Sequence, residues 1–145
     1  MKVISHRGNI NGRIEEAENR PDYIEDTIRL GYDVEIDVWV IEGTFHLGHD
    51  EPQYPISLNW LYERKDKLWI HCKNIEAMEW FNSLYGTYNY FWHENDVATL
   101  TSKGYIWSNI DHYFKNGITV SLEYKELPDY IWGVCSDYIY SYGHG

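Results

Sequence analysis

The sequence predicts an α/β protein, because short apolar runs alternate with helical segments and reactive side chains stand where the apolar runs end. Residues 21–30 have a proline at the helix start, acidic residues in the first turn and a glycine after the last turn. Residues 74–85 carry apolar side chains at helical spacing and also end before a glycine. Strand ends are where such proteins keep their reactive groups, so the same pattern predicts a functional site.

The expected strands are short, and most of them fall in the second half of the chain. Along the first half we expect a strand at 3–4, the helix at 21–30, a strand at 33–40, a short apolar stretch at 45–47, a short helix at 58–64, a strand at 67–72 and the helix at 74–85. Apolar or aromatic runs then predict strands at 88–92, 105–107, 118–122 and 130–134. The total is about seven strands.

Glu35 and Asp37 share one face of the strand expected over 33–40, because side chains alternate faces along a strand. Two like charges this close repel each other unless a cation lies between them or one of them takes a proton. Carboxylate oxygens are ligands for hard divalent ions. The spacing is consistent with a divalent metal site, and also with the solvated outer face of an antiparallel strand. Trp39, on the same face, favours the metal site.

Two histidines and an arginine stand beside the ends of apolar runs. His6 ends the first strand, and His49 follows the apolar stretch at 45–47. A histidine in such a position can move protons at neutral pH, and the adjacent Arg7 can bind a phosphate or a carboxylate. Each histidine also has a structural interpretation, as a hydrogen-bonded residue at a strand end or in a turn.

The order and spacing of these groups resemble the glycerophosphodiester phosphodiesterase family. The resemblance lies in His6-Arg7-Gly8, Glu18-Asn19, Glu35-Ile36-Asp37-Val38 and His49-Asp50, and more weakly in residues 69–73 and 133–138. It implies a (β/α) barrel in which His6 and His49 are the general acid and base. It also implies that Glu35 and Asp37 hold a divalent cation, that Arg7 contacts the phosphate, and that Glu18 supports the site and belongs with the metal residues.

The chain departs from that family at one metal position. His71 stands where the family has a third carboxylate, and Lys73, at the family's lysine position, lies on the same strand face. Imidazole suits zinc or manganese better than calcium or magnesium. The expected cofactor is therefore Mg²⁺, Ca²⁺ or Mn²⁺, with Zn²⁺ as a further candidate. The other interpretation of His71 is a packed core histidine.

The chain also departs from the family in length. It has 145 residues, whereas a full (β/α) barrel needs about 250. We therefore expect a reduced or irregular (β/α) TIM-type barrel, with several helices short or missing, in a single domain that spans residues 1–145.

Composition and charge narrow the class of partner. The formal net charge is −11, which disfavours nucleic acids and anionic membranes because both require a basic surface. A small phosphodiester substrate would be bound locally, by the metal with Arg7 and Lys73. His93 ends the strand expected over 88–92 and is a further candidate for substrate binding, or else a surface loop residue.

The sequence also bears on where the protein resides. The chain starts directly with the first strand, and no apolar run is long enough to cross a membrane. We therefore expect a cytoplasmic protein with no integral membrane segment. Cys72 and Cys135 fall in expected strands and are interpreted as buried thiols. Nothing in the sequence indicates an oligomeric state.

These observations predict a metal-dependent phosphodiesterase that acts on a glycerophosphodiester-like small molecule by acid–base catalysis through His6 and His49. Attack by water would make it a hydrolase, and attack by a substrate hydroxyl would give a cyclic phosphate, as in a lyase. The alternative is a catalytically degenerate barrel that binds a metal or a phosphorylated ligand without turnover. His71 and the short chain favour the alternative, whereas the intact histidine pair favours the enzyme.

Overall fold

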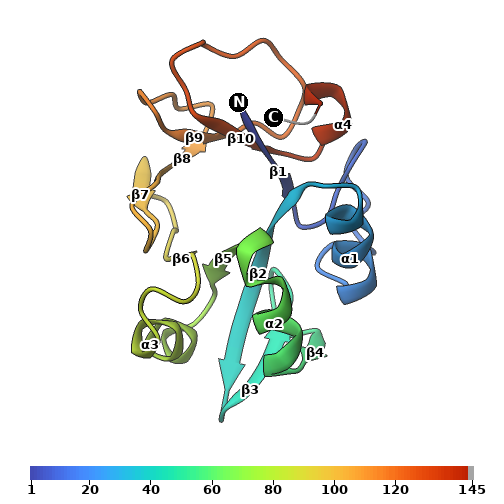
Figure 1. The fold of residues 1–145 in the computed structure, drawn as a ribbon, viewed down its shortest axis with the longest axis vertical. Coiled ribbons are helices and arrows are strands. Elements are labelled where there is room, and N and C mark those ends of the chain that lie inside the picture. Colours follow the sequence, from blue (N-terminus) through green and yellow to red (C-terminus); the bar gives the residue numbers. More distant parts are fainter. Residues whose placement is uncertain (144–145) are drawn as a thin grey trace.

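The computed structural model describes residues 1–143 and consists of one curled β-sheet with helices on its outer side (Figure 1). The strands are β1 (Lys2–His6), β2 (Asp33–Ile41), β3 (Thr44–Leu47), β4 (Tyr54–Ile56), β5 (Leu68–Cys72), β6 (Tyr90–Phe91), β7 (Ala98–Leu100), β8 (Ile106–Ile110), β9 (Ile118–Val120) and β10 (Gly133–Ser136). The helices are α1 (Pro21–Arg29), α2 (Leu58–Arg64), α3 (Ile75–Ser83) and α4 (Ile139–Tyr142), with a 3₁₀ turn at Lys65–Lys67.

Parallel strands form the central part of the sheet, in the order β6–β5–β2–β1–β10–β9–β8. Three strands are antiparallel to their neighbours. β3 pairs with the second half of β2, β4 pairs with β3, and β7 pairs with β8. Within residues 1–143 no ladder joins β6 to β7 or β8. Ser102 spans that side with three hydrogen bonds, two with the Tyr90 backbone and one to the Tyr88 carbonyl, and the sheet remains open.

The predicted reduced (β/α) TIM-type barrel is therefore wrong. A TIM barrel is a closed ring of parallel strands, each followed by a helix. This sheet is a mixed half-barrel, and its four α-helices together with the 3₁₀ turn make up 22% of the chain. The physical reason is the length of the connections after β6. The segments that join β6, β7, β8 and β9 are residues 92–97, 101–105 and 111–117, and they hold only turns and bends. Segments this short cannot form a crossover connection that contains a helix. After β7 the chain instead turns back, and β8 pairs with β7 in an antiparallel hairpin.

The local predictions for the helices in the first half are confirmed. The helix predicted over 21–30 is α1, with Pro21 in its first turn. The short helix predicted over 58–64 is α2, where the side chain of Ser57 accepts a hydrogen bond from the Trp60 backbone N–H. The helix predicted over 74–85 is α3, which Asn74 caps in the same way through the Ala77 N–H.

The two faces of β2 are buried against different surroundings. Its even-numbered residues, Val34 to Val40, belong to an apolar core that also includes residues of α1, α2 and α3. Its odd-numbered residues point to the inner face of the curl, where a second cluster consists of Ile4, Trp69, Phe91, Trp107, Ile118 and Cys135. The inner face thus has an apolar floor, with the strand ends at its edge.

Two further expectations can be compared with this structure. Cys72 and Cys135 are both free and buried, as predicted. Among residues 1–143, no helix is both long enough and apolar enough to span a lipid bilayer.

Candidate functional site

The carboxyl ends of four neighbouring parallel strands bring the reactive side chains together. His6 is the last residue of β1 and pairs with Glu35 in β2, while Asp37 pairs with His71 in β5. Asp137 directly follows β10, the other neighbour of β1. Residues in register on parallel strands point to the same side of the sheet. These five side chains therefore converge at one end of the inner face.

Glu35, Asp37 and His71 form a cluster that we call the cation cluster, because ligand atoms of all three lie within 4.8 Å of one another. Nδ1 of His71 is 3.1 Å from Oδ1 of Asp37 and 3.7 Å from Oε2 of Glu35. Glu35 and Asp37 are 3% and 0% exposed. The interpretation of these carboxylates as a solvated strand face is therefore wrong. Glu35 Oε1 and Asp37 Oδ1 have no hydrogen-bond partner.

The second oxygen of Asp37 is held by the loop after β1. Nδ2 of Asn19 donates to Asp37 Oδ2 at 2.9 Å, and Nε of Arg7 lies 3.3 Å from the same oxygen. Arg7 and Asn19 both adopt left-handed backbone conformations, with φ of 60° and 65°. Such conformations are costly for residues other than glycine and persist where surrounding contacts hold them, often at functional sites. Here the Asn19 N–H donates to the Arg7 carbonyl, and the Arg7 N–H donates to the Glu35 carbonyl.

The protonation of the cation cluster follows from its charges. Burial lowers the pKa of His71, but the adjacent Asp37 and Glu35 carboxylates outweigh it and raise the pKa to about 9. Burial likewise opposes ionisation of Asp37, but His71 and Arg7 hold its pKa well below the usual value. Without another cation, the protein therefore compensates two buried carboxylates with the His71 imidazolium and the Arg7 guanidinium.

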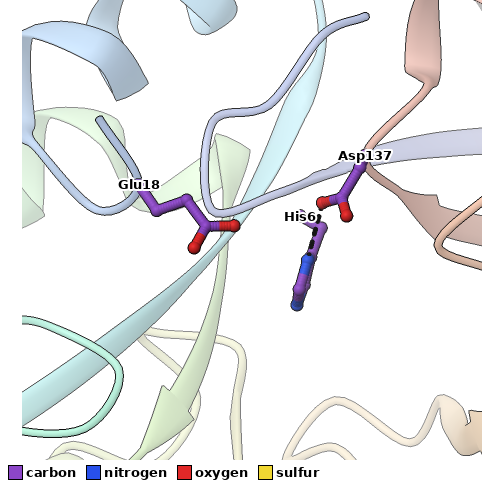
Figure 2. A group of neighbouring side chains, drawn as sticks. All are labelled: His6, Glu18 and Asp137. Atoms are coloured by element: carbon purple, nitrogen blue, oxygen red, sulfur yellow. Dashed lines mark hydrogen bonds and ion pairs between the residues drawn. The ribbon is translucent and has the colours of Figure 1, made fainter. Parts of the chain in front are cut away.

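His6 belongs to a second group, with Asp137 and Glu18 (Figure 2), and Asn9 bridges the two carboxylates. Nδ1 of His6 lies 2.8 Å from Asp137 Oδ1, and Asn9 Nδ2 donates to that oxygen at 2.9 Å and to Glu18 Oε2 at 2.8 Å. Burial opposes ionisation of Asp137, but hydrogen bonds from His6 and Asn9 and the charge of Arg7 keep its pKa below the usual value. An ionised Asp137 can only accept, so His6 donates through Nδ1 and presents the lone pair of Nε2.

Glu18 lies in this second group and not in the cation cluster. Its Oε2 accepts from Asn9, and its Oε1 lies 3.4 Å from Arg7 Nη1 and 3.3 Å from Arg13 Nε. The Asn9 amide donates into both carboxylates of the group, where a cation would need to bind. The contacts thus favour Glu18 as a support for Arg7 and Asn9 over Glu18 as a metal ligand.

His49 reaches the site from the turn after β3 and is 40% exposed. Its Nδ1 lies 2.7 Å from Arg7 Nη2. A guanidinium only donates, so Nδ1 accepts at this shorter contact, and the proton of the neutral ring is on Nε2. Nε2 lies 3.3 Å from the same Nη2 and 3.5 Å from Asp50 Oδ1, and Nδ1 lies 3.6 Å from Asp37 Oδ2. Trp39 Nε1 anchors the turn by donating to the Gly48 carbonyl at 2.7 Å. A Cβ at Gly48 would lie 2.0 Å from the Glu51 carbonyl oxygen, so the turn requires glycine there.

The two other residues predicted to bind substrate lie at the ends of β5 and β6. The carbonyl oxygen of His93 accepts a hydrogen bond from His71 Nε2 at 2.9 Å, and the His93 ring is bound to Asp96 at 2.8 Å. The described contacts thus give His93 a role in orienting His71. Lys73 directly follows β5 and is half-buried; within residues 1–143 its ammonium has no ion-pair or hydrogen-bond partner. Contact between either residue and a substrate stays a prediction.

A small cavity of about 120 Å³ opens beside Arg7 and Glu18 and is also lined by Arg13, Asn19 and His49, whereas His6 and the residues of the cation cluster do not line it. Three residues of the site, Asp137, Asn9 and Asn19, were not predicted as site residues. Asp137 carries the same signal as His6, a titratable side chain directly after an apolar run. The two asparagines stand in the polar loop after β1 and have no comparable signal outside the Glu18-Asn19 motif.

Comparison of the chain with protein-family models, with curated proteins and with solved structures finds no match. Two histidines with different partners meet at the site, His6 on Asp137 and His49 on Arg7, next to buried carboxylates that lack a full set of partners.

Proposed function

We propose that the chain is a metal-dependent phosphodiesterase that acts on a small glycerophosphodiester-like molecule. The observation that carries this proposal is that two histidines with different partners meet at one site, His6 on Asp137 and His49 on Arg7 and Asp37. Acid–base catalysis at phosphorus needs one group that takes a proton and one that gives a proton. The motif resemblance to the glycerophosphodiester phosphodiesterase family supports the same reaction.

His6 is the general base in this proposal. Asp137 accepts the Nδ1 proton of His6, which leaves the Nε2 lone pair free and stabilises the imidazolium that forms when Nε2 takes a proton. Nε2 takes that proton from the attacking hydroxyl, which belongs either to water or to the substrate itself. The new P–O bond forms as the proton leaves.

His49 is the general acid. In its imidazolium form the ring carries a proton on Nδ1, which can pair with Asp37 Oδ2, 3.6 Å away, and a second proton on Nε2. The P–O bond to the leaving group breaks, and the leaving alkoxide takes the proton from Nε2. The ring is then neutral, and Nδ1 accepts a hydrogen bond from Arg7. Solvent then restores both histidines. Arg7 also lines the cavity, where its guanidinium can bind a phosphoryl oxygen.

Glu35 and Asp37 would hold the divalent cation, whose charge would neutralise the phosphoryl oxygens as the bonds change. Four buried carboxylates, Glu18, Glu35, Asp37 and Asp137, are partly compensated by two cations, the Arg7 guanidinium, which is 12% exposed, and the His71 imidazolium. This excess of buried negative charge suits a cation and would repel a phosphodiester in its absence. The cavity of about 120 Å³ is well below the 300–1,000 Å³ of sites for drug-sized ligands, so it suits the phosphoryl group, with the rest of the substrate over the exposed rim.

The test is turnover by chelator-treated protein after addition of Mg²⁺, Ca²⁺, Mn²⁺ or Zn²⁺. Substrates are glycerophosphodiesters and the reporter bis-p-nitrophenyl phosphate. We expect metal-dependent turnover that falls by about 10²–10⁴-fold in His6→Ala, with the exposed His112→Ala as the matched control. Phosphorus NMR of the products separates a monoester, from hydrolysis, from a cyclic phosphate. Metal binding without turnover in any combination would instead support the alternative of a degenerate binding protein.

A further inference from the structure

We propose that His71 is a nitrogen ligand of the cation cluster and that it makes the site selective for Mn²⁺ and Zn²⁺ over Mg²⁺ and Ca²⁺. This inference rests on the cation of the proposed function and assigns its chemical class. It concerns the position where this chain has an imidazole and the family that its motifs resemble has a third carboxylate.

Contacts with His93 and Phe91 orient the His71 ring. Its Nε2 lies 2.9 Å from the His93 carbonyl oxygen, which can only accept, so Nε2 carries a hydrogen. The ring also stacks on Phe91, with centroids 5.2 Å apart and an interplanar angle of 14°, and the side chain is 15% exposed. Metal-binding histidines commonly donate their second N–H to a carbonyl in this way. The arrangement directs Nδ1 at Asp37 and Glu35.

The oxygens that face Nδ1 belong to Asp37 and Glu35. Asn19 and Arg7 occupy Oδ2 of Asp37, so Oδ1 is the oxygen that remains for a cation. Glu35 Oε1 is sealed from solvent and lacks a hydrogen-bond partner, although nearly all buried polar atoms have one. Asp37 Oδ1 is sealed as well, and it pairs with His71 Nδ1 at 3.1 Å. The ligand atoms lie within 4.8 Å of one another. Metal–ligand bonds of about 2.0–2.3 Å can span such a cluster with small adjustments.

The type and charge of the ligands determine which metal ions the cluster prefers. The cluster offers one neutral nitrogen and two carboxylates, so it has one negative charge fewer than three carboxylates would have. Mg²⁺ and Ca²⁺ prefer oxygen ligands, and their binding depends strongly on ligand charge. Mn²⁺ and Zn²⁺ accept imidazole. Most mixed nitrogen and oxygen sites rank Zn²⁺ above Mn²⁺, so the informative quantity is how the preference changes when His71 is replaced.

The experiment measures binding of the four metal chlorides to chelator-treated protein by calorimetry. The proteins are wild type, His71→Glu, His71→Gln and the exposed-histidine control His112→Gln. We expect the Mn²⁺ to Mg²⁺ affinity ratio to fall by about tenfold or more in His71→Glu and to remain unchanged in His112→Gln. His71→Gln should weaken Mn²⁺ and Zn²⁺ binding by about 10–100-fold.

A spectroscopic readout on wild type keeps the inference testable if His71→Glu fails to fold. Pulsed electron paramagnetic resonance of bound Mn²⁺ should show coupling to a histidine ¹⁴N nucleus, which His71→Gln abolishes. Mn²⁺ bound without that coupling, or an unchanged metal ratio in a folded His71→Glu, would overturn the role of His71 and leave the proposed phosphodiesterase intact. Failure of wild type to bind any of the four ions would overturn both.

Discussion

Replacing Asp137 with Asn would remove one negative charge from the partner of His6 and keep the shape of the side chain. The carboxylate Oδ1 accepts from His6 Nδ1 at 2.8 Å and from Asn9 Nδ2 at 2.9 Å. If the new amide places its oxygen there, both hydrogen bonds survive and only the charge is lost. If it places its NH₂ group there, His6 must accept at Nδ1, and Nε2 then carries the proton that it should be taking.

The size of the effect follows from these two cases. A unit charge about 4 Å from the imidazolium contributes about 4 kcal/mol at an effective dielectric constant of about 20, which is about 10³-fold in rate. The wrong tautomer costs more, and the same exchange in a Ser-His-Asp triad costs about 10⁴-fold. We therefore expect Asp137→Asn to lower kcat by about 10³–10⁴-fold, with little change in KM because Asp137 does not line the cavity.

The assay is the pH profile of kcat/KM with bis-p-nitrophenyl phosphate. The acidic limb should move to lower pH in Asp137→Asn, because protonated His6 has lost its counter-charge. Asp33→Asn, which neutralises a buried carboxylate at the opposite end of β2, is the matched control and should keep the wild-type profile. A folded Asp137→Asn protein with less than a tenfold loss and an unmoved acidic limb would refute Asp137 as the positioning residue for His6.

Three other predictions concern the same site. Combined His6→Ala and His49→Ala should be little worse than either change alone, because the pair acts as a unit; multiplied losses in turnover assays would contradict this. Glu35→Gln should weaken divalent metal binding at least tenfold in calorimetry, since it removes one of two charged ligands, and equal binding would remove Glu35 from the site. In chelated protein, the raised pKa of His71, about 9, stabilises the fold fully below its unfolded value of 6.5 and loses that contribution as the pH rises through 9. Wild type should therefore lose about 2–3 kcal/mol relative to His71→Gln between pH 7 and pH 10 in denaturant unfolding, and an unchanged difference would count against the buried ion pair.

Local patterns predicted the elements on which the site is built. Proline and acidic residues at a helix start, or asparagine and serine as caps, act within one turn, so the helices near Pro21, Ser57 and Asn74 could be placed from sequence. The shared face of Glu35 and Asp37 depends only on strand alternation, and it is present in β2. Their burial depends on tertiary packing, and only the weak signal of Trp39 pointed to it.

The fold class and part of the site depend on contacts that no local pattern carries. His6 and Asp137 are 131 positions apart and meet only because β1 pairs with β10. The position of Glu18 depends on where the Asn9 side chain lies in the loop after β1. A reduced or irregular (β/α) TIM-type barrel was expected from the motif resemblance, and the connections after β6 are too short to hold the helices of such a barrel. The motifs describe the first strands well and say little about the strands that would close the ring.

The open sheet explains how a chain of this length can keep such a site. The residues assigned to catalysis and metal binding come from four adjacent parallel strands, β10, β1, β2 and β5, and from the loops that follow them or the hairpin of β2. These strands are joined by continuous ladders, and the core beneath α1, α2 and α3 supports β2 and β5. None of the site residues named within residues 1–143 lies in β7, β8 or β9, the part that lacks helices. Register between neighbours, and not closure of a ring, sets the distances between His6, Glu35, Asp37 and His71. The absence of covering helices on β7, β8 and β9 therefore does not affect the geometry of the site.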